Sequence, residues 1–440
     1  MKIGIIGGGM AGLAAAYELL KEGHETILFE VSPYLGGQAA TFNVGGGRLE
    51  RGYHHLFASD VYMTNLIHEL GLGSKLAWLD SKVGFYHDGR IYDFVTPMDL
   101  LKFTPINLVD RVRLGLAALY LQRSKGWLKF ENITARDWIV KYAGKRNYDV
   151  VWGPLLRGKF GDSADEIGMT WFWGKIYLRF ASRGKGMQRE KLGYPMGSFG
   201  EVIDVLAQRI EEMGGKIHTS SPVTRILTEN GRAVGLEANV SKSELASFSF
   251  DSIIATVPSY IFPKLVPDLP EDYKEKLEGI RYHAAVLVVL VLKNRLSHIY
   301  WLNISDPSIP FLAIVEQTNF VDKSLYGGKH VVYLANYLGK HHPLYHKSGD
   351  ELLEEYVVHL RKINPNFERS WIEEYYYHRE EAAQPIITTN YLRQIPPYAT
   401  PIKNLYLANT TQIYPEDRGT NYSVGLGQRV SRLVIQNLEG

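Results

Sequence analysis

The sequence contains no cysteine, and this absence removes several kinds of chemistry. Disulfides, thiolate metal ligands, cysteine nucleophiles and a redox-active cysteine pair are all excluded. Long apolar runs are also lacking, because the most apolar segment, 284–292, is far too short to span a bilayer and predicts a buried β-strand. The first residues lead directly into an apolar segment typical of a strand rather than of a signal peptide, so we expect a cytoplasmic location.

An excess of charge of one sign is lacking as well. Lys and Arg total 49 against 47 Asp and Glu, which leaves a formal net charge of +2. Such a balance provides no general attraction to nucleic acid, and no nucleic-acid partner is predicted. The 440 residues are 45% hydrophobic, which is enough for a large core. The expected partner is a small-molecule substrate, with lipophilic compounds among the candidates.

What is present first is a glycine motif between an expected strand at 2–6 and an expected helix at 10–21. Gly7, Gly9 and Gly12 satisfy G-x-G-x-x-G, and Glu30 ends the next expected strand 18 residues later. The first glycine permits a tight turn, the second a close approach to a pyrophosphate, and the third close packing of helix on strand. The helix N-terminus, at Met10 and Ala11, then presents N–H groups to the phosphates. The motif predicts a bound dinucleotide.

The motifs that follow carry a family resemblance. Gly36-Gly37 lies six residues beyond Glu30, and the segments 50–54, 222–223, 251–258 and 404–432 follow in order. This series resembles the FAD proteins built like amine oxidases, protoporphyrinogen oxidases and phytoene desaturases, and more distantly UDP-galactopyranose mutases. The resemblance implies FAD as the cofactor. Gln38 stands where the family has Arg and Asn409 where it has Asp, which indicates a divergent branch.

The resemblance also implies the cofactor-binding residues and the fold. The residues expected at FAD are Gly7, Gly9, Met10, Ala11, Gly12, Glu30, Gly36, Gly37, Gln38, Gly52, Tyr53, His54, Val223, Thr256, Asn409, Thr420, Asn421 and Tyr422. The fold class expected is α/β, or α+β in two domains. A Rossmann-type FAD domain is assembled from 1–75, 197–260 and 395–440, and a substrate-binding domain is inserted between these segments. The inserted domain is expected to be helical over 76–196 and rich in sheet over 261–394.

Four polar residues are candidates for catalysis near the flavin. They are His54, His55, Arg418 and Tyr422. An imidazole there is suited to position substrate, donate to the flavin or attach it, although a histidine packed beside the cofactor is favoured. Glu416 to Arg418 are equally suited to a local ion-pair network. No metal site is predicted, because His341, His342 and His346 lie in a polar segment typical of a surface loop.

Two amphipathic stretches leave alternatives open. The run 152–183, which includes Lys159, Trp171 and Trp173, is suited to wall a substrate cavity, but core packing is favoured. A helix expected at 109–123 carries Val112, Leu116, Leu119 and Tyr120 on one face and arginines beside them. Packing of that face into the protein is favoured, and peripheral membrane contact stays open.

The function expected is that of a FAD-dependent oxidoreductase, in which hydride passes from a substrate C–H to flavin N5. The alternative is a flavin-dependent sugar-nucleotide isomerase resembling UDP-galactopyranose mutase, with Arg157, Arg179 and Arg418 as the available diphosphate ligands. A non-catalytic FAD-binding module is a third hypothesis. Substrate, electron acceptor and oligomeric state have no specific sequence signal.

Overall fold

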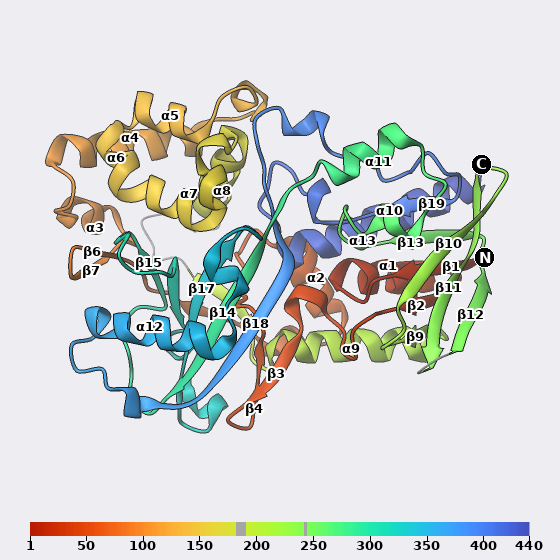
Figure 1. Ribbon diagram of the computed structural model, residues 1–440, viewed down its shortest axis with the longest axis horizontal. Coiled ribbons are helices and arrows are strands. Elements are labelled where there is room, and N and C mark those ends of the chain that lie inside the picture. The colour runs from red at the N-terminus through yellow and green to blue at the C-terminus, as the bar shows by residue number, and fades with distance from the viewer. Residues whose placement is uncertain (182–190, 242–243, 440) are drawn as a thin grey trace.

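The structure is a computed structural model that describes residues 1–181, 191–241 and 244–439. Two large β-sheets lie next to each other along the long axis of the molecule, and a group of helices stands above one of them (Figure 1). Both chain ends lie at the outer end of the parallel sheet (Figure 1). The chain is therefore a mixed helix and sheet protein of two parts, which confirms the predicted fold class.

A parallel five-stranded sheet forms the first part. Its strands, in spatial order, are β19 (Leu405–Leu407), β13 (Ser252–Ala255), β1 (Lys2–Ile6), β2 (Glu25–Phe29) and β9 (Lys216–His218). The strands are short apolar runs because helices cover a parallel sheet on its faces and bury it. They come from three remote stretches of sequence, as expected for a discontinuous domain. The predicted domain boundaries stay a prediction, which the membership of these strands supports.

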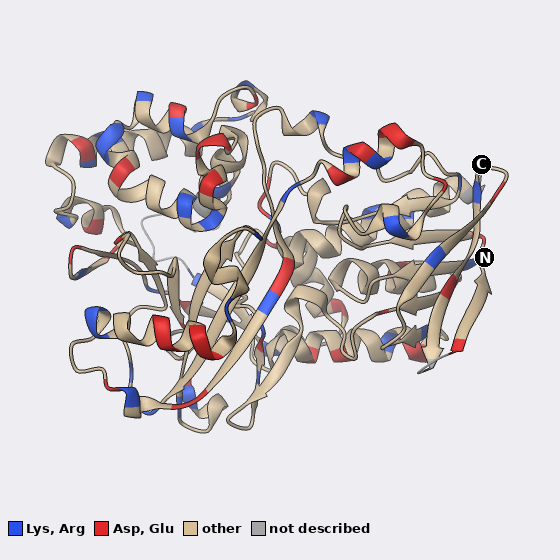
Figure 2. Cartoon of the chain, in the orientation of Figure 1, with Lys and Arg blue, Asp and Glu red and all other residues tan. Residues whose placement is uncertain are grey.

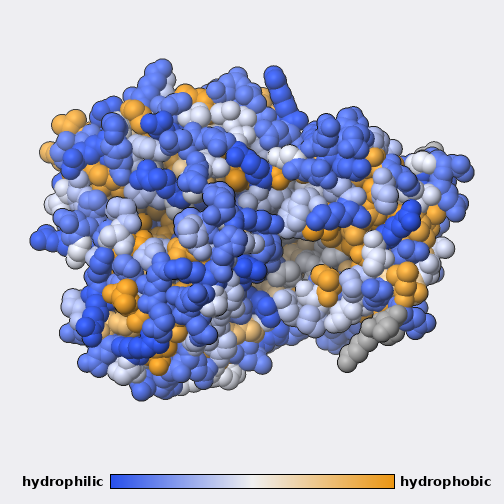
Figure 3. Space-filling model, viewed as in Figure 1, coloured by the Kyte–Doolittle hydropathy of each residue, from blue (hydrophilic) through white to orange (hydrophobic). Residues whose placement is uncertain are grey.

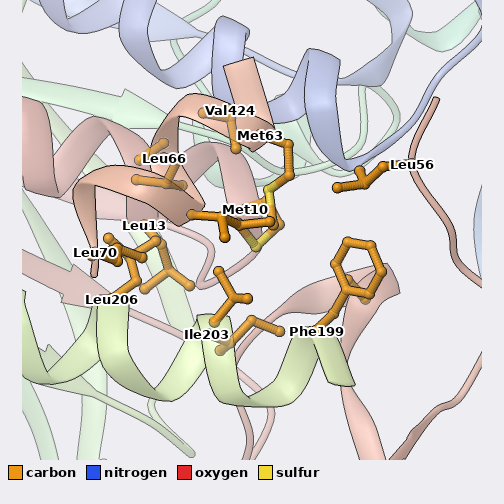
Figure 4. Packing of buried hydrophobic residues seen from close by; sticks show 14 of the residues in the cluster. Met10, Leu13, Leu56, Met63, Leu66, Leu70, Phe199, Ile203, Leu206 and Val424 are labelled. Atoms are coloured by element: carbon orange, nitrogen blue, oxygen red, sulfur yellow. The ribbon is translucent and has the colours of Figure 1, made fainter. Parts of the chain in front are cut away.

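Four helices pack around this sheet. They are α1 (Met10–Lys21), α2 (Val61–Glu69), α9 (Ser198–Glu212) and α13 (Thr420–Glu439). Met10 and Leu13 of α1 meet Leu66 of α2, Ile203 of α9 and Val424 of α13 in one apolar cluster (Figure 4). This cluster fixes the start of α13 against the start of α1.

An antiparallel three-stranded sheet stands beside the parallel one. It consists of β10 (Val223–Glu229), β11 (Arg232–Ser241) and β12 (Glu244–Ser249). The turn between its first two strands lies at Asn230 and Gly231, with φ of 50° and 73°. Positive φ at both central residues is the geometry that asparagine followed by glycine favours in a two-residue hairpin.

A seven-stranded sheet forms the base of the second part. Its order is β18 (Ile372–Pro385), β14 (Tyr282–Leu292), β17 (His330–Leu338), β16 (Ala313–Glu316), β15 (Trp301–Ile304), β6 (Val83–His87) and β7 (Arg90–Asp93). The apolar segment 284–292 lies within β14, which pairs on both sides and is buried, as predicted. Helix α12 (Gly349–Ile363) packs against this sheet.

The helices above this sheet form a third layer, which we call the helical part. It contains α3 (Pro97–Lys102), α4 (Leu108–Arg123), α5 (Ala135–Tyr142), α6 (Lys145–Asn147), α7 (Gly153–Phe160) and α8 (Met169–Ala181). Thr134 caps α5, because its hydroxyl accepts the backbone N–H of Asp137 at 3.0 Å. Trp138, Phe160 and Trp173 belong to the apolar core of this layer.

One prediction for the helical part is wrong. Helix α4 forms where expected, but its predicted inward residues Val112, Leu116 and Tyr120 are 50%, 61% and 51% exposed, and Leu119 is 37% exposed. The side that packs inward carries Leu114 instead, which is 4% exposed. The apolar face of α4 therefore points away from the core. Apolar side chains also gather at the left edge of the helical part in the space-filling view (Figure 3).

Candidate active site

The glycine loop between β1 and α1 has the shape that a pyrophosphate requires. Gly7 has a φ of 106°, and its N–H donates to the Phe29 carbonyl at 2.8 Å. A Cβ on Gly12 would lie 1.9 Å from the Gly7 carbonyl oxygen, so only glycine permits the contact. Helix α1 starts after Gly9 with no side-chain cap and no acid in its first turn. Its first N–H groups therefore suit an anionic ligand such as the pyrophosphate of FAD.

Glu30 lies at the carboxyl end of β2, beside this loop. It is 8% exposed, and one carboxylate oxygen accepts the Gly8 N–H at 2.6 Å while the other accepts the Ser32 N–H at 2.7 Å. Each oxygen has further acceptor capacity, which suits ribose hydroxyls. The Glu30 carbonyl accepts the Ser221 N–H at 2.8 Å, which brings the chain before Val223 next to the predicted ribose position.

The second glycine pair packs directly on the first loop. Gly36 and Gly37 both have positive φ, of 100° and 55°, and the Gly36 N–H donates to the Gly8 carbonyl at 2.8 Å. Gln38, where the family has Arg, donates its amide to the Ala382 carbonyl of β18 at 2.9 Å. One N–H of that amide therefore links the two parts of the protein, and the expected place of Gln38 beside FAD stays a prediction.

Two predicted cofactor residues use their side chains within the protein. The Asn409 amide nitrogen donates to the Val257 carbonyl and the Ser259 hydroxyl, and its oxygen accepts the N–H and the hydroxyl of Thr411. Both amide hydrogens are therefore used within the protein, and the expected place of Asn409 beside FAD stays a prediction. The Thr256 hydroxyl lies 3.0 Å from the Ile6 carbonyl oxygen, to which it donates. Both side chains position the ends of strands around the loop.

Helix α13 begins at Thr420, and the polar residues Thr420 to Tyr422 form its first turn. The Asn421 amide oxygen accepts the Met63 N–H at 3.0 Å and so fixes this start against α2. A Cβ on Gly419 would meet nothing within 4 Å. The N-terminus of α13 is therefore held against α2, and the space beside Gly419 is free of protein atoms.

A cavity of about 990 Å³ begins at this helix start and runs between the seven-stranded sheet and the helical part. All four candidate catalytic residues line it, namely His54, His55, Arg418 and Tyr422, together with Tyr53, Thr420 and Asn421. Farther from α13 its walls are apolar and include Leu100, Leu114, Leu155, Ile176 and Leu312. The fold therefore brings together residues that lie more than 350 positions apart in sequence.

The two histidines are packed and hydrogen-bonded, as favoured from the sequence. His54 Nδ1 donates to the Gly52 carbonyl at 2.6 Å, and the ring lies against Phe199. Burial lowers the pKa of His54 to about 4, so the imidazole is neutral at physiological pH. His55 Nδ1 lies 3.0 Å from the hydroxyl of Tyr300. Both rings present fixed polar edges in a largely apolar site.

A buried polar cluster lies at the α13 end of the cavity. Asp417 accepts hydrogen bonds from Lys159, Lys175 and the Trp171 indole, and Arg418 donates to the Tyr337 hydroxyl. The predicted ion-pair network therefore includes Asp417, but with partners from α7 and α8 rather than from its sequence neighbours. Lys175 and Tyr337 were not predicted to belong to this cluster. They lie on α8 and β17, far from Asp417 in the sequence, so no local pattern indicates them.

The described residues of the aromatic run 152–183 contribute both to the core of the helical part and to the wall of the cavity. Trp171 belongs to the helical core and also lines the cavity, whereas Trp173 is buried in that core and stacks on Tyr177 at 4.7 Å. Arg157 is exposed and is not among the lining residues. The side chain of Arg179 lies outside the described residues.

The described residues offer neither a cluster of metal ligands nor a membrane-spanning helix. His341 pairs with Asp162 at 3.0 Å on the surface, and no group of three or more His, Cys, Asp or Glu within 1–181, 191–241 and 244–439 is placed to hold a metal ion. In the same part of the chain, none of the helices has the length and apolar composition needed to cross a bilayer.

Comparisons with known proteins place the chain in a family. It is 26% identical over 296 residues to 15-cis-phytoene desaturase of Capsicum annuum, which covers 62% of this chain and 49% of the desaturase. The chain thus spans about half the length of that curated relative. An oxidoreductase from Methanosarcina mazei has a TM-score of 0.74 at 19% identity over all of both chains. A reduced UDP-galactopyranose mutase has a TM-score of 0.76 at 16% identity, over 99% of this chain and 95% of the mutase.

The two structural likenesses concern the fold alone, because the identities are low. A family model matches residues 10–425, which is nearly the whole chain. The match confirms the predicted superfamily and the FAD cofactor, and it supports the predicted class of oxidoreductase. The chain belongs to the flavin containing amine oxidoreductase family.

Proposed function

We propose that the protein is a FAD-dependent oxidoreductase that oxidises a C–H bond of a largely apolar substrate. The observation that carries this proposal is the cavity of about 990 Å³, which starts at Arg418–Tyr422 and continues between apolar walls. Its size is at the upper end of small-molecule sites, so it suits a long ligand. When bound, FAD supplies hydride-accepting chemistry at N5, while the protein supplies orientation and exclusion of water.

The glycine loop at 7–12, the second glycine pair at 36–37 and Glu30, which we call the cofactor cradle, fit FAD. The glycine loop and the uncapped start of α1 suit the pyrophosphate, and Glu30 suits the adenosine ribose. The N-terminus of α13, with Thr420 and Asn421 buried, presents the positive end of a helix dipole to the cavity. Neutral His54 and Tyr422 are suited to orient a substrate by hydrogen bonds without a charge of their own.

The sugar-nucleotide isomerase is less well supported. A diphosphate calls for arginines, which bind phosphate in a bidentate manner. Among the described residues that line the cavity, Arg418 is the one arginine, the two lysines already share the Asp417 carboxylate, and Arg157 is exposed elsewhere, so the cations suffice for one oxyanion better than for a diphosphate. Apolar walls also suit a nucleotide sugar poorly, because its many hydroxyls would be buried without partners.

The test is anaerobic mixing of the FAD-loaded protein with a panel of polyenes, porphyrinogens and amines. We expect loss of the oxidised flavin absorption with at least one apolar compound. No bleaching by any member, combined with conversion of UDP-galactopyranose by the pre-reduced protein without an electron acceptor, would overturn the proposal in favour of the isomerase.

The exposed face of α4 supplies a route for such a substrate. Leu114 and Leu119 of α4 line the cavity, while Leu108, Val109 and Leu116 of the same helix are 62%, 69% and 61% exposed. The segment 97–128 carries five basic and two acidic residues, and Figure 2 shows basic and acidic residues side by side on the helical part as a whole. We propose that this face, Leu108 to Tyr120, contacts an anionic bilayer from which apolar substrate enters.

A further inference from the structure

Two lysines converge on one carboxylate at the α13 end of the cavity. Asp417 Oδ2 accepts from Lys159 Nζ and from Lys175 Nζ, each at 2.7 Å, and Oδ1 accepts from Trp171 Nε1 at 3.1 Å. The Asp417 and Lys159 side chains are only 13% and 16% exposed. Because both residues line the cavity, the remaining exposed surface faces its interior.

Arg418 adds a third cation to this cluster. Its Nη2 donates to the Tyr337 hydroxyl at 2.6 Å, and that hydroxyl lies 3.5 Å from the hydroxyl of Tyr53. The Arg418 Nε is buried and has no hydrogen-bond partner. A buried donor of a charged group without a partner is costly, so the protein alone does not fully satisfy the Arg418 guanidinium.

The charges around the cluster do not balance. The described residues that line the cavity include three basic side chains, Lys159, Lys175 and Arg418, and two acidic ones, Asp60 and Asp417. Burial raises the pKa of Asp60 to about 6, so this carboxyl is still mostly ionised at pH 7 and the excess of positive charge is small. Burial lowers the pKa of Lys159 to about 7, since one carboxylate shared with a second lysine does not offset desolvation. The cluster therefore favours an added anion and disfavours a protonated amine.

We propose that Lys159, Lys175 and Arg418 form a subsite for one oxyanion, a carboxylate or a phosphate, at the end of an otherwise apolar substrate. The apolar remainder would extend along Leu155 and Leu114 toward α4. This inference rests on the proposed function, because it names the substrate class of the same cavity. The subsite would fix the position of one end of the ligand, because a charge-assisted hydrogen bond is directional whereas contacts with apolar walls are not.

Binding to the FAD-loaded, oxidised protein tests the subsite without turnover. The probes are dodecanoate, dodecyl phosphate and 1-dodecanol, measured by titration calorimetry and by the flavin spectrum. We expect at least one anion to bind with a Kd about tenfold below that of the alcohol, the size expected of a hydrogen bond to a charged group. The tighter anion identifies whether a carboxylate or a phosphate is preferred, and equal affinity assigns both to the subsite.

Variants assign the preference to the cluster. Lys175→Met and Lys159→Met should each remove most of the preference for the anion, while Lys145→Met, on an exposed lysine of α6 paired with Asp149, should leave it unchanged. Lys175 is 42% exposed, so its replacement disturbs folding least. An alcohol that binds as tightly as both anions, or an anion preference that survives both cavity variants, would overturn the subsite.

The pH dependence is a second readout. The Lys159 ammonium faces Asp417, Lys175 and Arg418, and it loses its proton as pH rises through about 7. The Kd of dodecanoate, whose carboxylate stays ionised throughout, should therefore rise between pH 6 and 8, an interval taken as about one unit either side of that pKa. Dodecyl phosphate is left out of this readout because its second proton, with a pKa of about 6, dissociates in the same interval. A flat profile argues against Lys159 as a ligand. Anion preference without oxidation of any substrate would spare the subsite and overturn the proposed reaction, and oxidation of neutral compounds without anion preference would do the reverse.

Discussion

Replacement of Asp417 by Asn should destabilise the α7–α8 side of the cavity far more than its small change in shape suggests. The carboxylate accepts three hydrogen bonds, two of them from lysines at 2.7 Å, and it is 13% exposed. At pH 6, below the pKa of Lys159, an amide in its place would leave the Lys159 ammonium buried without an anion. Loss of one member of a buried ion pair costs roughly 3–5 kcal/mol.

We take the lower end, about 3 kcal/mol, because Lys175 is 42% exposed and solvent screens part of its interaction. This energy corresponds to roughly a hundredfold loss of protection of α8 amides in native-state hydrogen exchange, an assay that needs no two-state unfolding. Asp149→Asn is the matched control, since its ion pair with Lys145 is 48% and 76% exposed. That change should alter protection by less than about threefold.

The pH dependence of this stabilisation has a definite sign. Burial acts to raise the pKa of Asp417, but the cations of Lys159, Lys175 and Arg418 outweigh it and hold the pKa well below its usual value. A carboxyl group with a lowered folded pKa stabilises the protein above its unfolded pKa and loses this effect only as pH falls through the folded value. The Asp417 carboxyl therefore stays ionised near neutral pH, and the effect of Asp417→Asn on α8 protection should become smaller above pH 7 because Lys159 loses its proton there. Equal protection in Asp417→Asn and Asp149→Asn would refute the reasoning.

Two further predictions concern the membrane face and the cofactor loop. Val109→Asp should weaken binding to anionic vesicles by about tenfold, because the 69% exposed valine would no longer enter the bilayer. Val358→Asp, at a 67% exposed valine of α12, is the control, and equal sedimentation of both variants with vesicles would remove α4 from the interface. Gly12→Ala should purify without FAD, because the added Cβ would lie 1.9 Å from the Gly7 carbonyl oxygen. Gly115→Ala, whose Cβ would meet only ordinary contacts, should retain FAD, and a normal flavin spectrum in the Gly12→Ala variant would contradict the structure of the loop.

The cofactor cradle was predictable because its signals are local and follow one another in order. The turn at Gly7, the approach of Gly12 and the acid Glu30 lie within one βαβ unit, where spacing alone fixes geometry. Asn409 shows how far such local signals extend. The sequence predicts its place at the end of the last strand, but not that its amide donates to Val257 and Ser259 of the protein itself.

The cavity cluster and the outward face of α4 were not predictable in the same way. Lys159 and Asp417 lie 258 positions apart, and no local pattern joins them. For α4, the period of its apolar residues identifies an apolar face but not what that face meets. Burial of Leu114 and exposure of Leu116 depend on α3 and α8, which only the tertiary structure supplies.

The central claim is that the apolar cavity leads substrate to the flavin. It is tested most directly by the anaerobic rate of flavin reduction in Ala118→Trp, which fills the cavity wall on α4. Leu245→Trp, at a 54% exposed leucine of β12, is the control. The proposed function predicts that reduction by an active apolar substrate slows at least about tenfold in Ala118→Trp alone, with the FAD spectrum unchanged. Equal rates of reduction in both variants and in the parent protein would contradict it.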